Sequence, residues 1–386
     1  MRALTRVISA VILASALACS RAAPPGARGP LALWVLAEGS ERTLESPEKI
    51  ARLVERAGEL RASDLFVQVY RAGRSWFPSS HADDAPFRAI RAAHPDAPEP
   101  LADLVARAHA RGIRVHAWFN CLALAANKDA PIVRALGRDA VLVDRLGRSL
   151  LDYPDGNVPQ PDGRWLELET PGYWLDPAVP GVVEYLEATV DDLARAVPDL
   201  DGLHLDYIRY PYALPMTPGS RFRGLDFGYG GIAKARFAAE NGSFEVGDKW
   251  DEFRRAQVGE LVTRLRARLP KRWKLSAAVI AYAERAYLTA LQDWRAWLED
   301  GRLDFAVAMA YTRDDRLLRY EAHALRFGVG GDRLWLGLGA WLVADEPGRI
   351  AKQIALARDV EPAGIALFSY DALAAKPAVL EALIHP

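Results

Sequence analysis

The sequence predicts an α/β protein, a closed (β/α)8 barrel of parallel strands covered by helices, and two observations support this prediction. Apolar strand-like runs alternate with amphipathic helical runs from Leu31 onward, the order that produces a parallel sheet between helices. Eight such strand-like runs occur, which is the strand number of the barrel. An open doubly wound sheet is the main alternative, but no Gly-x-Gly-x-x-Gly turn follows the first run.

The expected strands are short apolar runs, and turn-forming or charged residues bound them. In chain order they are residues 31–37, 64–70, 112–120, 202–208, 274–280, 305–311, 334–340 and 364–370. The expected helices, several of which begin at Ser, Asp or Pro, are residues 47–60, 100–111, 182–197, 250–269, 293–300 and 349–360. Long connections at 122–174 and 210–249 follow the third and fourth strands. They lie at the carboxyl ends of the strands, where (β/α)8 barrels carry their functional sites.

Charge balance and cysteine content exclude several functions. The chain has 49 Lys+Arg against 50 Asp+Glu and no long block of either sign, so nucleic acid, which requires a basic stripe, is not an expected partner. Its 2 cysteines are too few for a disulfide framework or a Cys-rich zinc site. Because His-x-His and His-Glu-x-x-His spacings are also missing, we expect no metal and no other cofactor.

The first residues resemble a secretory signal. Arg2 and Arg6 precede an apolar run that ends in small residues just before Cys19. We therefore expect a signal peptide at 1–18, a tether at 19–30 and a single domain at 31–386. Cys19 stands where a bacterial lipoprotein carries its lipid, which predicts a membrane-anchored protein of the cell envelope. The alternative is ordinary cleavage that leaves an unmodified Cys19 on a periplasmic or extracellular protein.

Polar residues stand near the ends of several otherwise apolar strands, where a buried polar group costs free energy unless it is paired or used. Strand side chains alternate between two faces, so His116, Trp118 and Asn120 share one face, as do His204 and Asp206. If these faces point into the barrel, the side chains converge at one end. The catalytic candidates are Asp206, His204 and Glu38.

Asp206 is the strongest of these candidates. A carboxylate between Leu205 and Tyr207 on an apolar strand should be desolvated, which raises its pKa and suits a general acid near neutral pH. The alternative is a structural role in which Asp206 caps a loop or pairs with Arg209 or Arg71, since ion pairs at strand ends are common.

The expected ligand-contacting residues are polar or aromatic and mostly lie at or beyond strand ends, where aromatic rings can stack on sugars. They are Gln68, Tyr70, Arg71, His116, Trp118, Asn120, Asp176, Tyr207, Arg209, Tyr311, Trp341 and Tyr370. The long loops are also expected to form a groove through Trp165, Tyr173, Trp174, Tyr210 and Tyr212. The alternative for these loop aromatics is that they pack the loops onto the barrel.

Several sequence runs together resemble the bacterial glycosyl hydrolase-like family 10. They are residues 115–120 (Val-His-Ala-Trp-Phe-Asn), 174–177 (Trp-Leu-Asp-Pro), 201–211 (Asp-Gly-Leu-His-Leu-Asp-Tyr-Ile-Arg-Tyr-Pro), 250–255 and 368–370 (Phe-Ser-Tyr). The resemblance implies a barrel that acts on envelope or extracellular polysaccharide, with the acid at the end of the fourth strand, Asp206, as the catalytic group.

The fourth strand is also distantly similar to the Asp-Gly-x-Asp-x-Asp-x-Glu strand of family-eighteen chitinases. His204 replaces the middle Asp, Ile208 replaces the general-acid Glu, and Asp206 matches the carboxylate that steers a substrate N-acetyl group. We therefore expect a glycoside hydrolase acting on an amino-sugar polysaccharide, such as peptidoglycan glycan or an exopolysaccharide. The alternative is a noncatalytic glycan-binding barrel. Candidates for a second carboxylate are Glu38, Asp176, Glu284 and Asp314.

The lipid-anchor hypothesis predicts that Cys19→Ala releases the protein from the membrane fraction, because the thiol is the only site for the lipid. Metabolic labelling with a fatty-acid analogue measures this directly. Wild type that takes up no label, or a Cys19→Ala variant that stays in the membrane fraction, would contradict the anchor and leave secretion itself intact.

Overall fold

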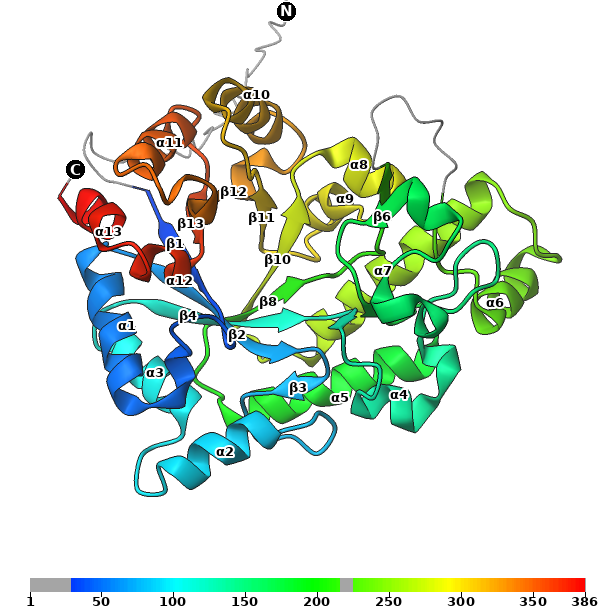
Figure 1. The fold of residues 1–386 in the computed structure, drawn as a ribbon, viewed down its shortest axis with the longest axis horizontal. Helices are drawn as coiled ribbons and strands as arrows, with labels where there is room; N and C mark the ends of the chain where they lie inside the picture. Colours follow the sequence, from blue (N-terminus) through cyan, green and yellow to red (C-terminus); the bar gives the residue numbers. More distant parts are fainter. Residues whose placement is uncertain (1–28, 216–224, 386) are drawn as a thin grey trace, which may run out of the picture.

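The computed structural model describes residues 29–215 and 225–385, and eight of its strands form a closed parallel barrel (Figure 1). In their order around the barrel they are β1 (Leu31–Val35), β2 (Asp64–Arg71), β4 (Arg114–Asn120), β8 (Gly202–Asp206), β10 (Lys274–Ile280), β11 (Phe305–Met309), β12 (Leu334–Gly339) and β13 (Gly364–Phe368). Strand β1 pairs with both β13 and β2, which closes the sheet. The predicted (β/α)8 architecture is confirmed.

Helices surround the barrel, and most of them begin at the signals that the sequence carries. They are α1 (Pro47–Glu59), α2 (Ala85–Ala93), α3 (Pro100–His109), α4 (Pro131–Leu136), α5 (Pro180–Ala196), α6 (Gly231–Asn241), α7 (Asp248–Arg268), α8 (Ala283–Leu288), α9 (Trp294–Glu299), α10 (Asp315–Arg326), α11 (Arg349–Arg358), α12 (Tyr370–Ala374) and α13 (Pro377–Ile384). In α1, Ser46 accepts a hydrogen bond from Lys49 N and Pro47 occupies the first turn. The apolar face of α1 is buried against the sheet.

Aromatic side chains fill the barrel interior. The interior cluster consists of Ala32, Trp34, Phe66, Trp118, Ala278, Val307, Trp335 and Ala366. Phe305 stacks on Trp335 with ring centroids 5.1 Å apart, and Phe66 contacts both rings. Rings of this size leave the barrel a packed core with no channel, so a ligand can reach only its ends.

The long connections after β4 and β8 form a layer of their own beyond the carboxyl ends of these strands, on the right of Figure 1. Strand β5 (Ala123–Ala125) pairs with β7 (Tyr173–Trp174), and β6 (Leu166–Leu168) pairs with β9 (Ala213–Pro215). The second pairing ties the two loops together.

The expected groove of loop aromatics does not form in these loops. Tyr173, Trp174, Tyr210 and Tyr212 are all less than 8% exposed, and only Trp165, at 52%, is open to solvent. The buried four pack the loops onto the barrel, which is the alternative that the sequence left open, because large rings lower the free energy most when they leave water.

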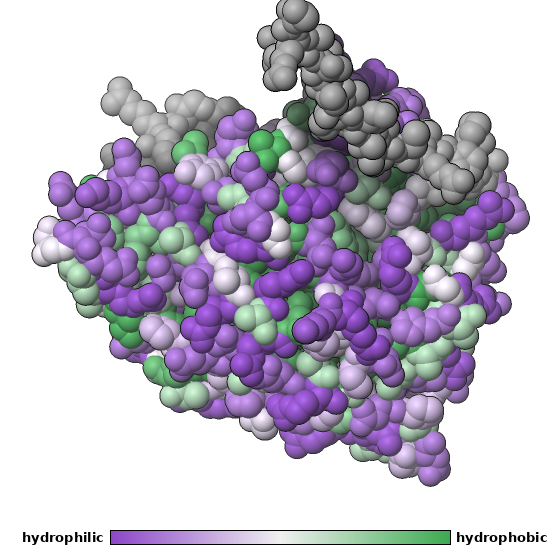
Figure 2. All heavy atoms as spheres, turned by 180° about the vertical axis from the view of Figure 1, so that it is seen from behind, coloured by the Kyte–Doolittle hydropathy of each residue, from purple (hydrophilic) through white to green (hydrophobic). Residues whose placement is uncertain are grey.

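The surface has no large apolar area on the face seen in Figure 2, where hydrophobic residues lie in small groups among hydrophilic ones. Within 29–215 and 225–385, no helix combines the length and apolar character needed to cross a membrane. The expected signal peptide, most of the tether and Cys19 lie outside the described residues.

Candidate active site

Asp206 ends strand β8 at the mouth of the barrel, where two N–H groups bind its carboxylate. Oδ2 accepts a hydrogen bond from Trp118 Nε1 at 3.0 Å, and Oδ1 accepts one from the backbone N–H of Tyr207 at 2.7 Å. Tyr207 has a φ of 49°, in the left-handed region that residues other than glycine seldom adopt. The chain therefore turns sharply at the strand end, directly after an aspartate that is only 8% exposed.

Burial raises the pKa of Asp206 from 3.8 to about 6. The Tyr207 N–H, the charge of Arg209 and the Trp118 N–H act in the opposite direction, and the nearby charge of Glu169 adds to the increase. Such a carboxyl is protonated in part of the molecules near neutral pH, as a general acid must be.

Arg209, the cation nearest to Asp206 in sequence, is bound to a different carboxylate. Its Nη2 lies 3.0 Å from Glu169 Oε2, and its side chain is 4% exposed. Its guanidinium carbon lies 5.2–5.5 Å from the centroids of three rings, those of Trp174, Tyr207 and Tyr212. These contacts hold the guanidinium on Glu169, so the ion pair between Asp206 and Arg209 that was the structural alternative does not form, although the charge of Arg209 still acts to lower the pKa of Asp206.

Glu169 is a further carboxylate near Asp206, and no strand-end pattern in the sequence points to it. It directly follows β6, and its backbone N–H donates to Tyr212 O at 3.0 Å. Thr170 Oγ1 donates to its Oε2 at 2.6 Å, beside the contact from Arg209. A search of strand ends in the barrel could not find Glu169, because it reaches the mouth on a loop. The alternating Leu166–Leu168 run before it is the only local signal.

A row of polar side chains runs from Asp206 across the neighbouring strands. Asn120 stands opposite Asp206 in the β4–β8 pair. Gln68 Nε2 donates to Asn120 Oδ1 at 3.3 Å, and Gln68 Oε1 accepts from Ala37 N at 3.4 Å. Three expected site residues therefore lie together on β8, β4 and β2, and the row ends at the segment that follows β1.

Glu38 lies on that segment, between two arginines. Its Oε2 is 2.5 Å from Arg71 Nη1 and its Oε1 is 2.5 Å from Arg74 Nη2. Asp371 fixes the segment by accepting hydrogen bonds from Leu36 N at 3.3 Å and Glu41 N at 3.0 Å. Arg71 is therefore bound to Glu38. The ion pair between Asp206 and Arg71, the other structural alternative for Asp206, does not form either.

His204 lies inside the barrel, below the mouth, and both its ring nitrogens are engaged. Trp34 Nε1 donates to Nε2 at 3.0 Å, which leaves Nδ1 to donate to Ser276 Oγ at 2.9 Å. Phe66 stacks on the imidazole with centroids 4.2 Å apart, and burial holds the pKa of His204 well below its usual range. These contacts make His204 a neutral core residue, a structural role in place of the proton carrier expected from the sequence.

His116 lies deeper in the barrel and is also structural. Its Nε2 is 3.0 Å from Asp64 Oδ1, which Arg114 binds as well. Burial opposes ionisation of Asp64, but the hydrogen bonds from His116 and Arg114 outweigh it and lower the pKa of Asp64 to about 2. Gly202 permits this packing, because a Cβ there would lie 2.5 Å from His116 Nδ1.

Two of the expected aromatic residues lie together at the mouth. Tyr311 meets Trp341 edge to face with centroids 4.9 Å apart, and Phe368 contacts both rings. Phe368 also contacts Trp118, the residue that donates to Asp206. Trp341 is 44% exposed, so this cluster offers a ring to a ligand beside the carboxyl.

Two other expected aromatics point away from the mouth. A register shift between Gln68 and Tyr70 in the β2–β4 pair turns Tyr70 outward, where it stacks on Phe119 at 4.1 Å. Tyr370 lies on α12 because β13 ends two residues earlier, and it is 2% exposed in the outer core. Neither side chain is placed to contact a ligand at the mouth.

The remaining candidate carboxylates have other surroundings. Asp176 is buried in the loop layer, where Oδ1 accepts from Ala178 N at 2.9 Å and burial raises its pKa to about 6. A hydrogen bond from Tyr210 and the charges of Arg254 and Arg236 act in the opposite direction and lower this pKa. Asp314 caps α10, and Glu284 lines a separate cavity beside α8. Among the described residues, no group of three or more His, Cys, Asp or Glu side chains is arranged to hold a metal.

An eight-stranded barrel with a desolvated carboxyl and an exposed indole at its carboxyl end defines a class, the (β/α)8 barrels that carry a ligand site at the carboxyl ends of their strands. The comparison with protein families agrees with this assignment. The chain belongs to the family described as Glycosyl hydrolase-like 10, whose model matches residues 31–319.

The curated relatives that match the chain are named as glycosyl hydrolases. The chain is 25% identical over 316 residues to the glycosyl hydrolase DigH of Escherichia coli O6:H1, a match that covers 75% of this chain and 65% of the relative. It is 23% identical over 315 residues to DigH of Escherichia coli K12, with the same coverage. The chain thus spans about two thirds of the length of these relatives.

Solved structures of glycosidases share the fold. The α-L-fucosidase isoenzyme 2 of Paenibacillus thiaminolyticus superposes with a TM-score of 0.58 at 12% identity, over 93% of this chain and 49% of that one. The catalytic domain of the β-amylase of Paenibacillus polymyxa gives 0.56 at 10% identity, over 92% and 97%. These likenesses show the barrel fold.

The raised pKa of Asp206 predicts a pH-dependent effect of Asp206→Asn on stability. The ordinary pKa is 3.8 and that of the folded state about 6, so ionisation of Asp206 disfavours folding progressively as pH rises through this window. The uncharged variant escapes this cost. Its melting temperature relative to wild type should therefore rise from about pH 4 to about pH 6 and then level off.

Asp199→Asn is the matched control, since this carboxylate at the opposite end of the barrel is 75% exposed. Its melting temperature should stay close to that of wild type, because the exposed ion pair of Asp199 with Arg272 contributes little to stability. A melting-temperature difference for Asp206→Asn that falls with rising pH would mean that the ionised form is stabilised by the fold.

Proposed function

We propose that the protein is a glycoside hydrolase acting on an amino-sugar-containing polysaccharide of the cell envelope or the extracellular space, with Asp206 as the general acid. The observation that carries this proposal is a buried carboxyl, with a pKa of about 6, that neither Arg209 nor Arg71 neutralises. Membership of the glycosyl hydrolase-like family supports the reaction class. The resemblance of the β8 strand to the chitinase strand supports the amino sugar.

In this reaction the Asp206 carboxyl donates its proton to the glycosidic oxygen while the bond from that oxygen to the anomeric carbon breaks. A water molecule then forms the new bond to the anomeric carbon, and the proton that it loses restores the Asp206 carboxyl. With a pKa of about 6, roughly one tenth of the molecules are in the donating form at pH 7. The N–H groups of Trp118 and Tyr207 stabilise the carboxylate that remains. They therefore act on the charge that develops as the proton leaves.

Glu169 supplies the second carboxylate. Its pairing with Arg209, which three aromatic rings confine, holds it in one position beside the mouth. The charge of this carboxylate, which Arg209 offsets in part, favours the positive charge that develops on the sugar ring in an oxocarbenium-like transition state. The two carboxyl groups thus have different surroundings and different tasks, one desolvated and one bound to a cation.

The proposed location follows from the same substrate. A signal peptide at 1–18, with a lipid on Cys19, would place the barrel in the cell envelope, where amino-sugar polysaccharides are accessible.

A glycan-binding barrel without catalysis is the second candidate function. Ile208, which stands where the chitinase strand carries its acid, is fully buried and has no proton to donate. Asp206 is therefore the only acid on β8. The two candidate functions, hydrolysis and glycan binding, differ in whether Asp206 donates a proton to a bound substrate.

Asp206→Asn should preserve the fold and lower the hydrolysis of amino-sugar oligosaccharides by about 10²- to 10⁴-fold, because an amide cannot donate the proton. An aryl glycoside with a nitrophenolate leaving group needs little protonation and should lose much less rate. Asp199→Asn should keep full activity on both substrates. Equal losses on both substrates would contradict the general-acid role, and a wild type inactive on every amino-sugar glycan would favour the binding-only barrel.

Glu169→Gln should lower the rate on both kinds of substrate and move the alkaline limb of the kcat/KM profile to lower pH. The reason for the shift is that Glu169 raises the pKa of Asp206, and Arg209 loses its counter-charge in the variant. Glu167→Gln, an exposed change two residues away, serves as the control. A Glu169→Gln profile that coincides with wild type would exclude Glu169 from the site.

A further inference from the structure

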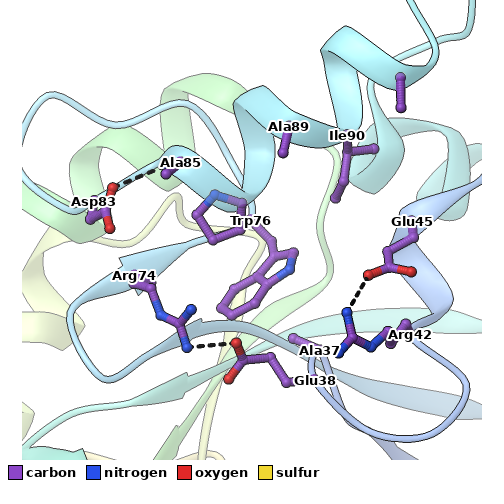
Figure 3. A pocket seen from close by; sticks show the side chains of 12 residues that line it. Ala37, Glu38, Arg42, Glu45, Arg74, Trp76, Asp83, Ala85, Ala89 and Ile90 are labelled. Atoms are coloured by element: carbon purple, nitrogen blue, oxygen red, sulfur yellow. Dashed lines mark hydrogen bonds and ion pairs between the residues drawn. The ribbon is translucent and has the colours of Figure 1, made fainter. Parts of the chain in front are cut away.

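A cavity of about 520 Å³ opens beside the mouth, next to Glu38 (Figure 3). Its volume lies within the range of roughly 300–1,000 Å³ that is typical of small-ligand sites. The walls come from the segment after β1, from η1 (Thr43–Glu45), from β3 (Arg74–Ser75) and from α2. Of the residues that the sequence predicts to be catalytic or to contact a ligand, only Glu38 lines this cavity.

Two fixed ion pairs flank the cavity. Arg74 Nη2 lies 2.5 Å from Glu38 Oε1, and Arg42 Nη1 lies 3.0 Å from Glu45 Oε1 (Figure 3). Each pair uses one of the five N–H donors of its guanidinium, so further donors are available to a ligand. Glu38 is shared with Arg71 and Glu45 with Lys49, and Asp83 also lines the cavity. Cations and carboxylates therefore nearly balance here, and the lining favours a ligand with many hydroxyl groups and no strong charge.

An indole and a further carboxylate complete the lining. Figure 3 shows Trp76 between the two ion pairs, and Arg74 Cζ lies 5.9 Å from the centre of its ring. Asp83 Oδ1 accepts from Ala85 N at 3.1 Å, which leaves its second oxygen to accept from a ligand. Trp76 is 4% exposed, so its indole forms the floor between these groups. The apolar side chains of Ala85, Ala89 and Ile90, with hydrogen-bonding groups around them, suit a pyranose, which has apolar C–H faces and polar edges.

The polar row described above connects this cavity to Asp206. It passes from β8 through Asn120 on β4 and Gln68 on β2 to the backbone of Ala37, which itself lines the cavity. These are three steps between neighbouring strands, or about 14 Å at the usual spacing of strands in a sheet. A short oligosaccharide can span that distance.

We infer that the cavity between η1, β3 and α2 is a saccharide-binding subsite, which holds an uncharged hexose or N-acetylhexosamine unit remote from the bond cleaved at Asp206. The inference rests on the proposed function. It assigns Glu38 to substrate binding, since its carboxylate positions Arg74 at the cavity wall. It also places the glycan across β8, β4, β2 and β1, away from the loop layer that the sequence favoured.

Ala89→Trp tests the subsite by filling it. Ala89 is exposed on α2 and lines the cavity, so the substitution removes no buried contact. Ala92→Trp is the matched control, because Ala92 is exposed on the same helix and does not line the cavity. Both changes are made in the Asp206→Asn background, and calorimetry measures the binding of N-acetylglucosamine oligomers of two and six units.

Ala89→Trp should weaken binding of the hexamer by about ten-fold or more and leave the dimer unaffected, whereas Ala92→Trp should change neither. The Trp76 indole N–H resonance should shift on addition of the hexamer. Equal hexamer affinity in both tryptophan variants, with no shift at Trp76, would overturn the subsite and leave the proposed function standing. If the Asp206→Asn protein with an unchanged α2 binds neither oligomer, both the subsite and the proposed function are wrong.

Discussion

The hydrogen bond from Trp118 Nε1 to Asp206 Oδ2 joins the packed interior of the barrel to its mouth. Trp118 stands opposite His204 in the β4–β8 pair, and His204 is fixed by Trp34, Ser276 and the stacked ring of Phe66. This packed layer excludes water from beneath Asp206 and sets the direction of the indole N–H. The same aromatic packing therefore stabilises the fold and raises the pKa of the carboxyl.

The distribution of charge around Asp206 depends on this packing. Arg209 could neutralise Asp206, but Trp174, Tyr207 and Tyr212 confine it and Glu169 binds it. The groups that hydrogen-bond to Asp206 are neutral N–H donors, and Arg209 acts on it only through space. A carboxyl in such surroundings retains its proton to higher pH, while Glu169 supplies a negative charge at the same mouth.

Much of the fold, and less of the site, could be predicted from the sequence. The eight strands were found within a few residues, because apolar runs alternating with amphipathic helices report burial directly. Asp206, Trp118, Asn120 and Gln68 do meet at the mouth, since strand alternation places them on one face. The alternation failed at Tyr70, where a register shift turns the chain, and at Tyr370, where the strand had already ended. Glu169 and the cavity at Trp76 arise from loop and helix contacts between distant segments, which no local pattern records.

The central claim is that the fold keeps Asp206 as an acid with a raised pKa, and a ¹³C NMR titration of its carboxyl carbon measures this most directly. The resonance is assigned by its loss in Asp206→Asn, and the titration is carried out on the intact protein. A midpoint near pH 6 is the expected result. A midpoint at or below the ordinary value of 3.8 would contradict the account, because it would show that the fold stabilises the ionised carboxylate and that Asp206 has no proton to donate near neutral pH.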